Sequence, residues 1–276
     1  MPDSLKTLLR SPQGVVGGGL CLLALALVVL GPWLAPFEPN ALSFTARYQP
    51  PGMTHWFGTD QMGRDVLSRV MVGARDTIVM SLLATVIAMA LGAVIGTLSA
   101  YLGGRLDEAI MRTMDAIMAI PSLLFALLIV ATLGKSDVNA VAAIAIAFTP
   151  GMVRVARSVA LAVRTQDYVS AAVVRGESTS YIVVHEMLPN IVAPVIVEGT
   201  VRVAFAVMLF ATLSFLGLGA QPPSSEWGLM VSEARSHLFT APWMMIMPGL
   251  CIALVAIGFN LLGDGLRDAF NPRSRT

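Results

Sequence analysis

Long apolar runs alternate with shorter polar segments along the whole chain. Each run is close to the ~20 residues that a helix needs to cross the hydrocarbon core of a bilayer. The pattern therefore predicts an all-α, polytopic membrane protein with six transmembrane helices. The predicted spans are residues 15–34, 77–102, 107–133, 140–163, 191–218 and 243–262.

The polar segments divide the chain into one membrane domain with two short ends. We expect a cytosolic N-terminal segment over residues 1–14, a transmembrane domain over 15–264 and a cytosolic tail over 265–276. The longest polar segments inside the domain are expected to be an outer loop at 35–76, a cytosolic loop at 164–190 and an outer loop at 219–242.

Composition agrees with a membrane protein. Hydrophobic residues make up 56% and charged residues 13% of the 276 residues, whereas about 25% of a soluble domain is charged. The formal net charge of +1 gives no reason to expect a nucleic-acid partner. Cys21 and Cys251 both fall inside apolar runs, so neither a disulfide nor a metal site is predicted.

The loop over residues 167–190, DYVSAAVVRGESTSYIVVHEMLPN, is a charged island between two spans. We expect one short helix from Tyr168 to Val174, an interruption at Gly176, and a second helix capped by Ser178 or the residue after it. Leu188-Pro189 should close the second helix, because proline cannot continue the hydrogen-bond ladder. Two short helices joined at a glycine form a projection that fits a groove on another protein. The alternative is an ordinary loop between spans.

Small residues and prolines are expected to shape the spans. Pro121 should kink the third span, and Pro150-Gly151 should break the fourth. The second span carries a small residue at every fourth position, which lets another helix approach closely, although a pore-lining face is also possible. These residues are Ala88, Gly92, Gly96 and Ala100.

Ionisable residues inside spans are rare and mark candidate functional positions. Glu198 and Arg202 are four residues apart, so they share a face of the fifth span and can neutralise each other about 16 Å into it. Arg202 either contacts a substrate or locks helices together. Asp115 either pairs with Arg112 at the membrane interface or belongs to a path or gate. Glu198, Arg202 and Asp115 are therefore the candidates for a translocation path.

The second half of the first outer loop reads HWFGTDQMGRDVLSRVMVGAR. An apolar face from Val66 to Met71 predicts a short helix at the membrane surface before the next span. His55, Asp60 and Asp65 could instead form a metal or catalytic site, but no second histidine or activating base accompanies them.

Basic residues predict the orientation, because cytosolic loops of membrane proteins carry more lysine and arginine. With both termini in the cytosol, the outside regions carry fewer basic residues, although the 35–76 loop weakens the bias. The basic residues assigned to the inside are Lys6, Arg10, Arg105, Arg164, Arg175, Arg267, Arg273 and Arg275.

The 167–190 loop resembles the EAA loop of ABC importer permeases. Ala171-Ala172, Gly176, Ile182 and Leu188-Pro189 match that motif, whose coupling helix docks on the ATP-hydrolysing subunit. Ser170 stands where the motif has a glutamate, so the polar contact of that glutamate is not implied here.

Three further stretches resemble the dipeptide/oligopeptide/nickel branch of the same family. The matches extend from about His55 to Pro272 and fall in family order, and the chain looks like the second permease of the pair. The stretches are GTDQMGRDVLSR, LSFLGLGAQPPSSEWGLMVSEAR and NLLGDGLRDAFNP.

The resemblance implies a type I importer permease fold in a bacterial plasma (inner) membrane. It implies a second homologous permease, two ATP-binding subunits and an extracytoplasmic solute-binding protein as partners, beside the lipid bilayer. ATP and Mg would bind the partner ATPase subunits, and this chain would bind no cofactor. The residues expected to couple the permease to the ATPase are Tyr168, Ala171, Ala172, Arg175 and Gly176.

The sequence has no GxxxxGK[ST] phosphate loop, so the chain is not expected to hydrolyse ATP. The expected function is half of the translocation path for peptides or similar small solutes. A stand-alone secondary transporter or channel is the alternative, with Glu198 and Arg202 as its ionisable pair. An intramembrane enzyme is disfavoured, since the spans carry no Ser–His, paired-Asp or HExxH constellation.

Overall fold

A computed structural model describes residues 7–9 and 11–270, and within them it is helical without a strand. One isolated bridge pairs Thr59 with Asp65. The principal helices are α2 (Pro12–Leu34), α3 (Val66–Leu102), α4 (Gly104–Met118), α5 (Ser122–Leu133), α6 (Asp137–Arg164), α7 (Asp167–Val174), α8 (Thr179–Tyr181), α9 (Leu188–Phe215), α10 (Trp227–Ala234) and α11 (Trp243–Phe270). Short turns complete the list: 3₁₀ turns η1 (Phe44–Ala46) and η3 (Arg235–His237), and the π-helical η2 (Ile182–Met187).

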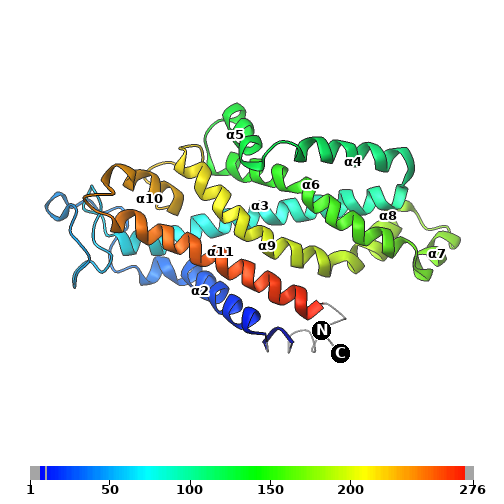
Figure 1. Cartoon of the computed structure of the whole chain (residues 1–276), viewed down its shortest axis with the longest axis horizontal. Helices are drawn as coiled ribbons and strands as arrows, with labels where there is room; N and C mark the ends of the chain where they lie inside the picture. Colours follow the sequence, from blue (N-terminus) through cyan, green and yellow to red (C-terminus); the bar gives the residue numbers. More distant parts are fainter. Residues whose placement is uncertain (1–6, 10, 271–276) are drawn as a thin grey trace.

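The long helices form one bundle around α3, α6 and α9 (Figure 1). Helices α2 and α11 pack together on one side, and α4 and α5 lie on the opposite side. We call the end that carries α7 and α8 the α7 end, and the end that carries α10 and the 35–65 segment the α10 end (Figure 1). Of the predicted end segments 1–14 and 265–276, residues 1–6, 10 and 271–276 lie outside the described part.

Five helices are long and apolar enough to cross a membrane, and α4 with α5 makes a sixth span if the bent pair is counted as one. This count of five or six agrees with the prediction of six spans when the bent pair is counted, but the third span differs from the prediction. The prediction of one kinked helix is wrong, since α4 and α5 meet at 90°. Proline disfavours helical backbone at the residue before it, and Pro121 is itself extended (φ −53°, ψ 131°), so α4 has ended before it.

Helix α3 begins earlier than predicted, at Val66, and continues without a break to Leu102. The separate surface helix expected near Val66 is therefore wrong: these residues form the first turns of the span. Asp65 fixes the start, because its carboxylate accepts a hydrogen bond from the backbone N–H of Ser68 at 2.8 Å. The segment contains no proline, and its glycines, such as Gly73, lie inside the helix without ending it.

Helix α6 is also continuous, so the predicted break at Pro150-Gly151 is wrong. Helix α11 extends to Phe270, beyond the predicted end of the sixth span at residue 262. Leu188-Pro189 likewise does not close a helix. Pro189 lies in the first turn of α9, directly after the π-helical turn η2, and α8, η2 and α9 form one long helical segment.

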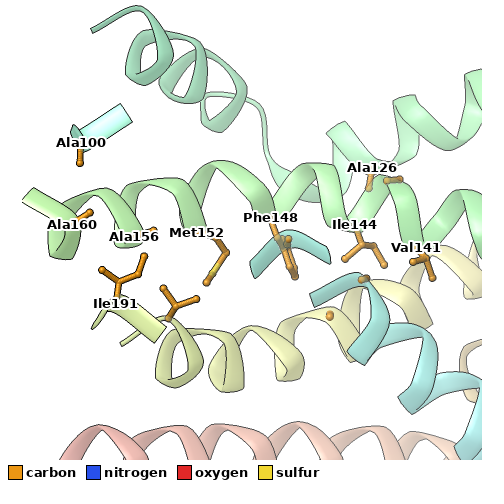
Figure 2. Close-up of a cluster of buried hydrophobic side chains, with 14 of the residues drawn as sticks. Ala100, Ala126, Val141, Ile144, Phe148, Met152, Ala156, Ala160 and Ile191 are labelled. Atoms are coloured by element: carbon orange, nitrogen blue, oxygen red, sulfur yellow. The ribbon is translucent and has the colours of Figure 1, made fainter. Parts of the chain in front are cut away.

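The core of the bundle is the contact between α3 and α6 (Figure 2). Helix α6 presents a buried stripe at a spacing of three to four residues, and the small residues of α3 pack against it, as predicted. A Cβ on Gly96 would lie 2.5 Å from the Val153 carbonyl oxygen, so the helices approach to backbone contact there. The stripe comprises Val141, Ile144, Phe148, Met152, Ala156 and Ala160.

Candidate functional site

The α7–α8 segment projects from one end of the bundle (Figure 1). Helix α7 buries Val169 and Ala172, which belong to the main core cluster, and this contact fixes the helix to the bundle. Ala171 and Tyr168 are exposed, and Val174 is 87% exposed. The two adjacent alanines therefore face different ways: Ala172 inward and Ala171 outward.

Gly176 sets the angle at which the chain leaves α7. Its φ is +77°, and a Cβ at this position would meet no atom within 4 Å. Glu177 N–H donates to the Ala172 carbonyl at 3.2 Å and Gly176 N–H to the Val173 carbonyl at 3.0 Å. These are the two hydrogen bonds of a Schellman motif, which needs a left-handed residue at this position. The predicted glycine interruption is confirmed.

Arg175 makes its ion pairs within this segment. Arg175 lies 3.3 Å from Glu186 and 3.5 Å from Glu177, so its guanidinium bridges the two arms of the turn. Ser178 caps α8, as expected, by accepting a hydrogen bond from the N–H of Tyr181 at 3.3 Å. The turn is thus held by its own ion pairs and cap.

The charged residues that were expected to pair in the spans form three ion pairs. Arg202 Nε donates to Glu198 at 3.1 Å, which confirms the pairing predicted from their spacing. The predicted pairing of Arg112 with Asp115 is wrong. Arg112 pairs with Glu108 one turn earlier at 2.6 Å, and Asp115 reaches Arg154 on α6 at 2.5 Å. Arg112 thus finds its partner on its own helix, four residues earlier, whereas the packing of α4 against α6 brings Arg154 to Asp115.

Three cavities follow one another along a single face of α9. The first, of about 320 Å³, opens between α6, α9 and α11; the second, of about 400 Å³, between α5, α6 and α9; the third, of about 400 Å³, between α9, α10 and α11. The second and third share Met208 and Thr212 as wall residues, so they adjoin each other. The α9 residues along this face are Pro194, Val197, Glu198, Arg202, Phe205, Met208, Leu209, Ala211, Thr212 and Phe215.

A buried ionic network at the α10 end was not predicted from sequence. Asp60 and Glu233 each pair with both Arg64 and Arg69, at 2.5–3.0 Å, and Arg69 also donates to the Ser224 carbonyl at 3.0 Å. Two arginines and two carboxylates balance in charge. The network fastens the segment before α3 to α10.

The alternative of a metal site at His55, Asp60 and Asp65 does not match this geometry. His55 Nδ1 lies 2.8 Å from Asp65, which also caps α3, whereas Asp60 is engaged by the two arginines. Among the described residues, no group of three or more His, Cys, Asp or Glu side chains is placed to hold a metal ion. The local sequence shows only the acidic side chains near His55. It could not show that they belong to an ionic network, because Glu233, which also pairs with Arg69, lies 164 residues from Arg69 in sequence.

Glu226 is a second buried acid at the α10 end. Its carboxylate caps α10 by accepting from Leu229 N–H at 2.8 Å, and it accepts from the Thr77 hydroxyl on α3 at 3.1 Å. The adjacent Trp227 is fully buried and donates from its indole to the Val70 carbonyl at 2.9 Å. Burial raises the pKa of the Glu226 carboxyl to about 7.

We predict that Glu226 makes the protein less stable as pH rises. An unfolded glutamate titrates near 4.5, so between pH 4.5 and 7 the folded state retains a proton that the unfolded state loses. The contribution of this carboxyl group to the free energy of unfolding is therefore fully present below pH 4.5. It decreases by roughly 3 kcal/mol as the pH rises to about 7. The thermal midpoint of the native protein should fall relative to Glu226→Gln across this range. Parallel pH profiles would contradict the prediction.

Comparison with known proteins assigns the chain to a family. Residues 88–276 match the model of the binding-protein-dependent transport system inner membrane component, and residues 2–51 match the N-terminal transmembrane domain of oligopeptide transport permease C. A probable D,D-dipeptide transport system permease of Escherichia coli (strain K12) is 44% identical, over 96% of this chain and 89% of that relative. A dipeptide transport permease of Alkalihalophilus pseudofirmus is 38% identical over 99% of this chain and 90% of its own length, and a glutathione transport permease of Pectobacterium atrosepticum is 36% identical over 98% and 90%. The chain therefore belongs to the inner-membrane permeases of binding-protein-dependent ABC importers, on their dipeptide/oligopeptide branch, and has the type I importer permease fold.

Proposed function

We propose that this chain forms half of the translocation path of an ATP-driven importer for peptides or similar small solutes. The observation that carries the proposal is the line of cavities along α9, which runs from Pro194 near the α7 end to Phe215 near the α10 end. One mid-helix ion pair, Glu198–Arg202, lies on that face. A second permease placed against this face would close the groove into a path.

The α7 segment is proposed to couple the path to ATP hydrolysis on a separate subunit. Exposed Tyr168 and Ala171 would contact the ATPase, while buried Ala172 holds α7 rigidly to the bundle. Gly176 would set the angle of α7, and Arg175 would brace the turn through Glu186. Motion of the ATPase would then reach α9 directly, because α8, η2 and α9 are one helical segment.

The proposed assembly follows the family. It contains this chain, a second homologous permease, two ATP-binding subunits that carry ATP and Mg, and an extracytoplasmic solute-binding protein. This chain would bind no cofactor and would have no catalytic role. The substrate proposal is a peptide, since the relatives are named for D,D-dipeptide, dipeptide and glutathione transport.

The orientation proposed is with both termini and α7 in the cytosol. Gly14 near the start of α2 lies against Gly265 near the end of α11, so both helices meet at one end of the bundle. Arg105, Arg164, Arg175 and Arg267 lie in or beside the segments assigned to the cytosol. Because basic residues are more frequent on the cytosolic side of membrane proteins, these arginines favour a cytosolic α7 end.

Reconstitution tests the proposal. Liposomes containing the two permeases and the two ATPase subunits should accumulate a labelled dipeptide when ATP is supplied on the cytosolic side and the binding protein on the other. Omitting ATP or this chain should abolish accumulation. Accumulation by this chain alone without ATP would instead support a secondary transporter or channel.

A further inference from the structure

Arg202 lies at the middle of α9, which spans Leu188–Phe215: it is fourteen positions after the first residue of the helix and thirteen before the last. A guanidinium at that depth is costly unless it faces protein, water or an opposite charge. Its side chain is 28% exposed, and it lines the central cavity of about 400 Å³ together with Ser122, Leu123, Phe205 and Thr212. Arg202 therefore faces the proposed path.

The guanidinium is held in a fixed place by α6. Its terminal nitrogen would lie 2.8 Å from a Cβ on Gly151, so the absence of a side chain at this position provides the space that it occupies. Its central carbon lies 5.7 Å from the ring centroid of Phe148, within the range of a cation–π contact. Figure 2 shows Phe148 on α6 between Ile144 and Met152. Gly151 and Phe148 form a socket for the guanidinium.

The ion pair with Glu198 uses only part of the donor set of Arg202. Only Nε donates to Glu198, and among the described residues neither terminal amino group has a hydrogen-bond acceptor. Arg157 uses more of its donors, because both its Nε and one terminal amino group donate to Asp107 at 2.6 Å. Arg157 thus makes a bidentate contact typical of a structural ion pair. Arg202 instead keeps its two terminal amino groups available, and these can bind a second carboxylate.

Glu198 has a second cation within reach. Its other carboxylate oxygen lies 4.0 Å from Arg267 on α11, whose side chain is largely exposed. The three residues together carry one net positive charge. Glu198 and Arg267 line the cavity at the α7 end, and Arg202 lines the central one, so Glu198 stands at the junction of the two.

We propose that Arg202 binds the carboxylate of the transported solute in the central cavity, and that Glu198 is a resting counter-ion which transfers to Arg267 when that carboxylate arrives. The proposal rests on the proposed function. At rest, Glu198 neutralises the mid-membrane guanidinium. When loaded, the solute carboxylate replaces Glu198, and Glu198 pairs with Arg267. Neither step leaves an uncompensated charge at the middle of the membrane, which would be costly.

The test measures the charge preference of the cavity in the complete transporter. Ser122→Cys on the cavity wall, with Cys21→Ser and Cys251→Ser, is labelled by an anionic or a cationic methanethiosulfonate. The ratio of the anionic to the cationic rate should fall about ten-fold on Arg202→Gln, because the variant removes a positive charge from the wall of the same cavity, where low-dielectric surroundings strengthen its effect. Arg202→Lys, which keeps the charge, should retain most of the ratio. Arg112→Gln, which removes an exposed guanidinium on α4, should leave it unchanged.

Solute protection tests the carboxylate itself. Dialanine at millimolar concentration should slow labelling of Ser122→Cys, whereas dialanine amide, which lacks the carboxylate, should not. Gly151→Ala adds a methyl group where the guanidinium lies and should weaken protection without removing charge. An unchanged rate ratio in Arg202→Gln, or equal protection by the peptide and its amide, would overturn the proposal. ATP-driven uptake of dialanine by the same cysteine variant is measured separately, so its absence would count against the proposed function instead.

Discussion

Replacing Gly176 with valine is expected to reduce ATP-dependent uptake to background while the protein remains in the membrane. The φ of +77° is strained for any residue with a Cβ and most strongly for a β-branched one. No neighbouring atom lies within 4 Å, so the substitution introduces backbone strain without a steric clash. The turn should relieve the strain by leaving the left-handed conformation, which redirects α7. Uptake of labelled dipeptide into proteoliposomes, with membrane content checked by immunoblot, measures the effect.

Two variants separate backbone strain from the position in the chain. Gly176→Asn should retain most of the uptake, because asparagine tolerates the left-handed region. Gly217→Val introduces the same kind of strain at φ +75°, also with no atom within 4 Å, in the turn that follows α9. It should leave ATPase coupling intact. Normal uptake by Gly176→Val, or equal loss in both valine variants, would contradict the role assigned to the α7 turn.

Replacing Arg69 with methionine is expected to lower the free energy of unfolding by about 3–5 kcal/mol. Arg69 is 2% exposed and contacts both Asp60 and Glu233. Methionine fills much of the space, but it leaves the buried carboxylate of Asp60 and the partly buried carboxylate of Glu233 facing Arg64 alone. The network would then carry an uncompensated negative charge in a largely buried place. The thermal midpoint of the purified protein should fall accordingly, measured by scattering or intrinsic fluorescence.

Arg112→Met is the matched control for Arg69→Met. Arg112 also pairs with a carboxylate at 2.6 Å, but its side chain is 77% exposed. Exposed pairs of this kind contribute about 0–1 kcal/mol. The midpoint should therefore change little. Equal destabilisation by the two substitutions would show that the buried network is no more important than a surface ion pair.

Local patterns were sufficient for several features of this molecule. The spacing of apolar runs predicted the spans, and a four-residue spacing predicted the Glu198–Arg202 pair. Gly176 between two short apolar segments predicted the turn after α7. Each of these depends on residues within one continuous stretch of sequence, from four residues for the ion pair to about 20 for a span.

Other features depend on contacts between residues that are distant in sequence. Asp115 pairs with Arg154 because α4 lies beside α6, and the 90° bend at Pro121 decides where α4 lies. The partners Arg69 and Glu233 meet only once α3 and α10 are packed. Pro150 was expected to break α6, but tertiary packing of its buried face keeps the helix continuous. Local propensity was overridden in that case.

Co-purification from mild detergent is the most direct measurement of whether the α7 segment couples this permease to an ATPase. An ATP-binding subunit should co-purify with the native chain and with Gly217→Val, and it should be lost from Gly176→Val. If the native chain instead purifies without an ATPase, and transports solute in liposomes without ATP, the coupling role of α7 is contradicted and Glu198 with Arg202 becomes the pair of a stand-alone transporter.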